Sequence, residues 1–244
     1  MKKSFSNTYI FVFSVIMVTA VAVLLSFVSM QLKPRQEMNV QVEKKQDVLS
    51  SVGEGEDVGQ AASKNTYIDE EFSKYITGSY VVDFEGNLVE TDAFEVMLDL
   101  ENEVRKPREE RNYPVFVYTG DNGSKKYVVP VRGKGLWGPI WGYIALQADL
   151  NTISGAVFDH KGETPGLGAE INTEHFESQF AGKTIFDENG KFVSIEVVKG
   201  GADPSNPHEV DAISGGTITS KGLQAMLEDC LTGYVAYFKK LANQ

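Results

Sequence analysis

Cysteine is nearly absent from this sequence, which contains a single one, Cys230, among 244 residues. One cysteine excludes an intrachain disulfide, an iron–sulfur cluster held by four thiolates of this chain, and a Cys-x-x-Cys-His haem attachment. Histidine is also scarce: His160, His175 and His208 lie far apart and lack the paired spacing that is typical of a zinc site. We therefore expect no metal centre in this chain.

Basic residues are outnumbered, with 23 Lys and Arg against 34 Asp and Glu and a formal net charge of −11. Such a chain repels a phosphate backbone, so nucleic acid is excluded as a partner and another protein fits better. The Gly-x-Gly-x-x-Gly fingerprint of a dinucleotide-binding fold is also missing, which argues against an NADH site on this chain.

Charge is missing altogether from residues 10–30, which are dominated by Val, Ile, Leu and Phe. As a helix this run would span about 30 Å, the thickness of a membrane's hydrocarbon core. A cleaved signal peptide is the competing interpretation, but the run is long and no small-x-small cleavage site follows it before Lys33. We expect residues 1–32 to form a cytoplasmic tail and one transmembrane helix.

The next segment, residues 33–65, is predicted to be a linker. It begins with a loosely periodic stretch, residues 39–52, that favours a short helix. It continues through residues 53–64, which are rich in Gly, Ser and acid and are typical of a flexible connection. One folded domain, residues 66–244, is then long enough to bury a core.

Alternating apolar runs separated by turn residues predict several strands in this domain. The predicted strands are residues 80–84, 114–118, 127–131, 140–146, 153–158 and 192–198, with turns at residues 85–87 and 121–123. Helical spacing occurs at residues 93–104 and 174–180 and in an amphipathic C-terminal segment that begins after residue 220. The fold class is therefore α+β, with a largely antiparallel sheet.

A glycine-containing segment, residues 211–220, precedes the C-terminal helix directly. Gly215 and Gly216 let backbone amides approach an anion, and the helix start offers free N–H groups and a positive dipole end. We expect Thr219 or Ser220 to be the N-cap of that helix. The segment suits a phosphate, although an ordinary turn followed by a capped helix explains the same residues.

Two further segments have the character of a cofactor site. Residues 133–143 interleave glycine with large apolar side chains, and Leu136 or Trp137 can cover a flat ring, or can simply pack in the core. Residues 163–168 form a Pro-Gly loop with polar groups beside an apolar one. Its candidate contacts are Glu163, Thr164, Leu167 and Gly168. Lys199, which precedes two glycines, can balance a phosphate or be an ordinary surface lysine.

Taken together, these segments resemble NqrC, one of the membrane-anchored subunits of the bacterial sodium-translocating NADH:quinone reductase. This family shares its FMN-binding domain with the G subunit of the Rnf complex. The resemblance covers nearly the whole chain. It is carried by residues 135–146, 163–170, 182–186, 198–200 and 211–220 in this order after one membrane span.

The resemblance implies covalent flavinylation. The family's pattern is Asp, two variable residues, Ser or Thr, Gly, Ala and Thr, and its last threonine is esterified to the phosphate of FMN. Asp211, Ser214 and Gly215 match, Gly216 replaces the usual Ala, and the acceptor is Thr217, with Thr219 as an alternative. The implied cofactor-binding residues are Leu136, Trp137, Glu163, Thr164, Leu167, Gly168, Lys199, Ser214, Gly215, Gly216 and Thr219.

The resemblance also implies a place and partners. A flavin transferase that uses FAD, with Mg²⁺, would load the domain on the periplasmic side of the bacterial inner membrane. The loaded protein would relay electrons among the membrane, flavin and iron–sulfur subunits of the complex, on the route from NADH to ubiquinone that is coupled to sodium export. The chain would have no catalytic residue of its own and would be active only within the complex.

Three alternatives remain open from the sequence. The first is the Rnf G subunit, which passes electrons between ferredoxin and NAD. The second is a flavin-free, membrane-anchored scaffold, which is consistent with Gly216. The third is a phosphate-recognising hydrolase with Ser214 or Thr217 as nucleophile, although no histidine lies near them in the sequence.

Overall fold

The computed structural model describes residues 6–242, which divide into two compact units, one ending at Glu43 and one beginning at Lys44. The helix α1 (Asn7–Ser51), which begins in the first unit, is long and apolar enough to cross a membrane. The sequence predicts two helices here, residues 10–30 and 39–52, whereas the structure has one helix that runs through Pro34. Good helix formers around Pro34, such as Leu, Lys, Arg, Gln and Glu, favour this continuity.

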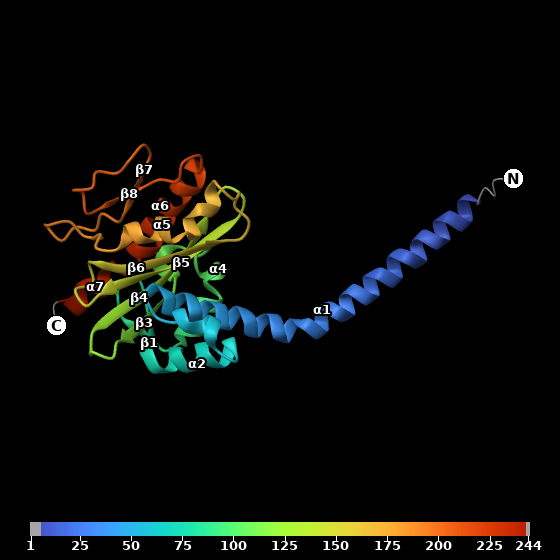
Figure 1. The fold of residues 1–244 in the computed structure, drawn as a ribbon, viewed down its shortest axis with the longest axis horizontal. Helices are drawn as coiled ribbons and strands as arrows, with labels where there is room; N and C mark the ends of the chain where they lie inside the picture. Colours follow the sequence, from blue (N-terminus) through green and yellow to red (C-terminus); the bar gives the residue numbers. More distant parts are fainter. Residues whose placement is uncertain (1–5, 243–244) are drawn as a thin grey trace. The chain divides into compact units, whose positions relative to one another are not determined.

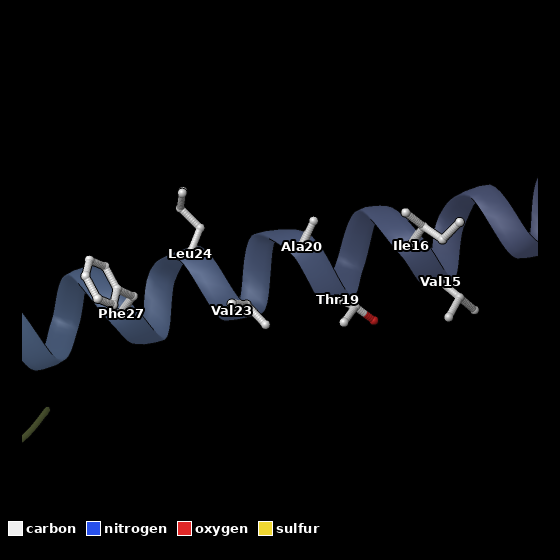
Figure 2. A pocket seen from close by; sticks show the side chains of 7 residues that line it. All are labelled: Val15, Ile16, Thr19, Ala20, Val23, Leu24 and Phe27. Carbon is white, nitrogen blue, oxygen red and sulfur yellow. The ribbon is translucent and has the colours of Figure 1, made fainter.

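The apolar side chains of α1 are exposed over the predicted membrane span. Figure 2 shows a hollow along this helix that is bordered by seven side chains, all from α1 itself. These are Val15, Ile16, Thr19, Ala20, Val23, Leu24 and Phe27. Because one helix supplies the whole border, the hollow is the space between neighbouring side chains. Lipid tails fill such spaces in a membrane.

The second unit is built on a six-stranded sheet in which every neighbouring pair is antiparallel. Its order is β2-β1-β3-β4-β5-β6. The strands are β1 (Ile76–Val82), β2 (Leu88–Val89), β3 (Tyr113–Thr119), β4 (Lys125–Lys134), β5 (Pro139–Gln147) and β6 (Ile153–His160). A separate parallel pair joins β7 (Glu196–Val198) to β8 (Glu209–Asp211). The predicted α+β class and the largely antiparallel sheet are confirmed.

Helices cover both faces of the sheet (Figure 1). Helix α6 (Thr217–Thr232) packs on one face, where Leu223 and Leu227 join Val129 and Ile144 in an apolar core. Helix α2 (Lys64–Tyr75) lies on the other face. Its Phe72 contacts the rings of Phe116 in β3 and of Phe94 in α3 (Ala93–Leu98), which places α3 beside it. Burial on two faces explains why the central strands are apolar at successive positions.

The remaining elements are short and connect these layers. They are α4 (Leu100–Glu103), α5 (Glu174–Glu177), α7 (Val235–Ala242) and the 3-10 helices η1 (Glu56–Gln60), η2 (Arg108–Glu110), η3 (Gly168–Asn172) and η4 (Ser178–Phe180).

Several element bounds differ from those predicted. The helix expected at residues 93–104 is divided at Asp99 into α3 and α4, and the C-terminal helix is divided at Gly233 and Tyr234 into α6 and α7. A Cβ atom at Gly233 would overlap the ring of Tyr113, so glycine at this position lets the ring lie close to the backbone. The strand expected at residues 192–198 is limited to the three residues of β7.

Candidate functional site

The first turn of α6 presents Thr217. The helix begins at this residue, and its N-cap is Gly216, which makes no side-chain capping bond. The expected caps, Thr219 and Ser220, are wrong, because both side chains lie in the first turns and are 1% exposed. The Thr219 hydroxyl donates to Glu163 instead, and Ser220 Oγ accepts from the Ile213 amide at 3.1 Å. Thr217 itself is half-buried.

A hollow of about 230 Å³ lies beside Thr217, and we call it the threonine hollow. Three segments line it: the loop between β4 and β5, the loop after β6, and the start of α6. Its lining residues are Leu136, Trp137, Glu163, Thr164, Leu167, Gly168, Gly215, Gly216, Thr217, Ile218 and Thr219. Ten of these are residues that the sequence singles out, from three separate motifs.

Apolar side chains around the threonine hollow remain in contact with water. Trp137 is 69% exposed, Ile218 57%, Leu136 46% and Leu167 42%. Exposed apolar side chains gathered around a hollow are typical of a ligand-binding surface. The sequence analysis did not include Ile218 in the site, although helical geometry could have indicated it. Successive residues of a helix point about 100° apart, so a core-facing Thr219 places Ile218 on another side.

Glycine allows the three segments to approach one another. A Cβ atom at Gly168 would overlap Thr219 Oγ1 and would lie 2.5 Å from Glu163 Oε2. Gly215 has φ of 74°, and a Cβ there would lie 2.5 Å from a methyl group of Leu167. Side chains at Gly168 and Gly215 would therefore push the loops apart and change the shape of the hollow.

The floor of the hollow contains a buried carboxylate, Glu163, which is 5% exposed. Its Oε1 accepts the backbone N–H of Trp137 at 2.8 Å, and its Oε2 accepts the hydroxyl of Thr219 at 2.6 Å. The backbone N–H of Glu163 donates to Nδ1 of His160 at 3.2 Å. All three segments of the site therefore meet at this residue.

A larger groove of about 910 Å³ adjoins the hollow, and we call it the outer groove. Thr217 and Gly215 line both spaces, whereas the two other predicted residues, Lys199 and Ser214, line only the outer groove. His175 also borders this groove, but within residues 6–242 no hydrogen bond joins its ring to Ser214 or Thr217.

The described residues contain no group of three or more His, Cys, Asp or Glu side chains placed to hold a metal ion.

The sheet and this site define an FMN-binding domain, and the family model of that description matches residues 135–232. The Neisseria meningitidis serogroup B relative, the NqrC component of its Na⁺-translocating NADH-quinone reductase, is 34% identical, over 99% of this chain and 96% of the relative. The corresponding Vibrio vulnificus protein is 32% identical, over 83% and 82%. The chain belongs to this NqrC family.

Solved structures agree with this membership. The crystal structure of the Parabacteroides distasonis member is 40% identical and superposes with a TM-score of 0.72, covering 85% of this chain and 96% of that one. The crystal structure of Shewanella oneidensis NqrC is 29% identical with a TM-score of 0.67, covering 84% and 98%. The resemblance stated from the sequence is confirmed, and the chain is one component of an oxidoreductase complex.

Proposed function

We propose that this chain relays electrons within a Na⁺-translocating NADH:ubiquinone reductase through FMN that is attached to Thr217 by a phosphoester. The observation that carries the proposal is the contrast between two threonines. Thr217 is half-buried and borders both the threonine hollow and the outer groove. Thr219 is 1% exposed, and its hydroxyl is engaged with Glu163. Of the two candidate acceptors, only Thr217 is reachable.

The residues around Thr217 fit FMN. Leu136, Trp137 and Leu167 supply an apolar, partly open surface for a flat ring. Lys199 in the outer groove and the free N–H groups at the start of α6 suit the single phosphate charge. Thr164, Gly168, Ser214, Gly215 and Gly216 would complete the cofactor-binding set.

Attachment requires a flavin transferase that uses FAD. The Thr217 Oγ forms a bond to the flavin-side phosphorus, and the bond from that phosphorus to the bridging oxygen breaks. AMP leaves with the bridging oxygen, and the hydroxyl proton passes to a base of the transferase. Bound FMN supplies reversible electron transfer. The covalent bond prevents dissociation, so the contacts of Leu136, Trp137 and Leu167 are free to tune the ring's redox potential.

The helix α1 would anchor the chain in the bacterial inner membrane as a single span, with the domain on the periplasmic side. Partner membrane, flavin and iron–sulfur subunits would hold the NADH and quinone sites. The relatives described above are all NqrC proteins of the quinone reductase, which favours this complex over an Rnf-type ferredoxin:NAD oxidoreductase.

The experiment is to express the full chain with an FAD-dependent flavin transferase, denature it, and look for flavin fluorescence in the protein band. Wild type is compared with Thr217→Ala and with Thr219→Val at the end of the reaction. We expect fluorescence in wild type and Thr219→Val and none in Thr217→Ala. Fluorescence that survives in Thr217→Ala would place the acceptor elsewhere. A dark wild type beside an active transferase would favour the flavin-free scaffold.

A further inference from the structure

Glu163 lines the threonine hollow, yet its carboxylate is buried and each of its two oxygen atoms accepts a hydrogen bond from within the chain. Burying a carboxylate costs free energy unless hydrogen bonds replace its water. Here the Trp137 N–H and the Thr219 O–H, from segments far apart in the sequence, each donate to one carboxylate oxygen. Hydrogen bonds to a charged acceptor are stronger than neutral ones. The carboxylate therefore holds two segments together.

We propose that Glu163 is a positioning residue for the threonine site. Its carboxylate fixes the rotation of the first turn of α6 and the position of the loop between β4 and β5, which carries Trp137. Thr217 is thereby presented to the hollow. The consequence for flavin attachment rests on the function proposed above, whereas the bond from Glu163 to each segment does not depend on it.

Helix geometry explains how Thr219 controls Thr217. Two residues apart on a helix, side chains point about 200° from one another. When the Thr219 hydroxyl is held by Glu163 in the hollow, Thr217 points to another side of the helix, where it borders the outer groove as well as the hollow. A first turn that lost this bond would be free to rotate or fray.

Two glycines let the backbone pack closely against the Glu163 carboxylate. A Cβ atom at Gly135 would lie 2.5 Å from Glu163 Oε1, and one at Gly168 would lie 2.5 Å from Oε2. The backbone approaches both oxygen atoms more closely than any other residue type permits.

Glu170, in the neighbouring 3-10 helix η3, is a matched control. Its Oε1 accepts the Gly166 N–H at 2.8 Å, but the residue stays partly exposed, and among the described residues no hydrogen bond joins its side chain to Trp137 or Thr219. Removing the Glu170 carboxylate tests the general effect of losing a charge and a loop hydrogen bond without touching the proposed function of Glu163.

The first measurement is hydrogen–deuterium exchange of the Trp137 amide in the unmodified full-length chain. We expect Glu163→Ala to accelerate this exchange by at least roughly tenfold, since a hydrogen bond to a charged group is lost, and Glu170→Ala to leave it unchanged. Unchanged exchange in Glu163→Ala would overturn the proposal. No flavin is needed for this result, so it stands or falls apart from the proposed function.

The second measurement compares Thr219→Val with Thr219→Ser, and it applies even if Glu163→Ala fails to fold. Valine keeps the shape of threonine without the hydroxyl, and serine keeps the hydroxyl. With limiting transferase and FAD, we expect the initial rate of flavin attachment at Thr217 to fall roughly tenfold in Thr219→Val and to stay near wild type in Thr219→Ser. Equal rates in all three, or equal losses in the two variants, would contradict control by the hydroxyl–carboxylate bond.

Discussion

Glu177 is a partly buried carboxyl beside the edge strand β6. Burial raises the pKa of Glu177 to about 7, from an ordinary value of 4.5, and the nearby Asp159 and Glu174 add to this effect. The Phe158 amide on the edge strand β6 donates to its Oε1 at 2.7 Å and acts in the opposite direction. The folded domain therefore holds a proton on Glu177 at pH values where the unfolded chain has released it.

This raised pKa predicts a pH-dependent loss of stability. Between pH 4.5 and about 7 the folded state binds more protons than the unfolded state, so the free energy of unfolding falls as pH rises through that window. Glutamine at 177 keeps an acceptor for Phe158 and removes the charge. Because Glu177 keeps some contact with water, we expect Glu177→Gln to be more stable than wild type by about 1 kcal/mol above pH 7.

Denaturant unfolding at about pH 5 and about pH 8 measures this difference. The exposed Glu188 provides the control, and Glu188→Gln is expected to follow the wild-type profile. A Glu177→Gln profile that is parallel to wild type over the whole range would show that Glu177 is ionised in the folded state at neutral pH.

At the scale of elements, α6 and β4 are packed closely enough to bring Thr217 to the Trp137 loop. A Cβ atom at Gly222 in α6 would overlap the carbonyl oxygen of Lys134, and one at Gly133 in β4 would lie 2.6 Å from Cβ of Met226. Glycine on each element thus meets the partner element directly. The distance between helix and strand depends on these two residues.

Gly222→Ala tests this packing. Alanine is a better helix former than glycine by about 1 kcal/mol, but its methyl group meets a backbone carbonyl that cannot move alone. We expect a net loss of about 1–3 kcal/mol in the free energy of unfolding, measured by denaturant titration of the full chain. The neighbouring exposed residue gives the control, Lys221→Ala, which we expect to be nearly neutral. A Gly222→Ala variant as stable as wild type would mean that α6 can shift away from β4 at little cost.

Four of the longer strands were predictable from the sequence. The runs at residues 114–118, 127–131, 140–146 and 153–158 lie inside β3, β4, β5 and β6. The central strands β3, β4 and β5 leave long apolar runs because they are buried on both faces. The two-residue β2 and the three-residue β8 are too short to show a period. The helix α2 was missed, since Ile68 and Tyr75 are its only fully buried residues.

The candidate site was likewise predictable only in part. Motif order and the family resemblance gathered ten residues that the fold places around one hollow. The pairing of Glu163 with Thr219 could not be predicted, because it depends on how α6 is rotated against a loop 56 residues away in the sequence. The prediction of the N-cap was wrong for the same reason. Thr219 and Ser220 are good N-cap residues, but tertiary contacts hold their hydroxyls inside the domain.

At the scale of the whole molecule, the chain combines an apolar helix with a folded unit that carries all of the acidic excess. We expect full-length protein to remain with membranes after a carbonate wash and to be released only by detergent. A chain lacking residues 1–32 should be released without detergent, because it loses the candidate span.

The truncated chain also tests the side on which flavin is attached. With an exported transferase, deletion of residues 1–32 should abolish in-gel fluorescence, and a cleavable export signal in their place should restore it. Fluorescence of the truncated chain without any export signal would overturn the periplasmic assignment.

The hydrogen bonds at the first turn of α6 bear on whether the domain folds before or after it receives its cofactor. The N-cap of this helix is a glycine, and Glu163, Thr219 and Trp137 satisfy one another within the chain, so no contact among these residues waits for a cofactor to complete it. The domain can therefore finish folding first and receive its prosthetic group later. A loading enzyme would meet a rigid, preassembled surface rather than a nascent peptide, and the supply of flavin would limit activity without limiting the amount of folded protein.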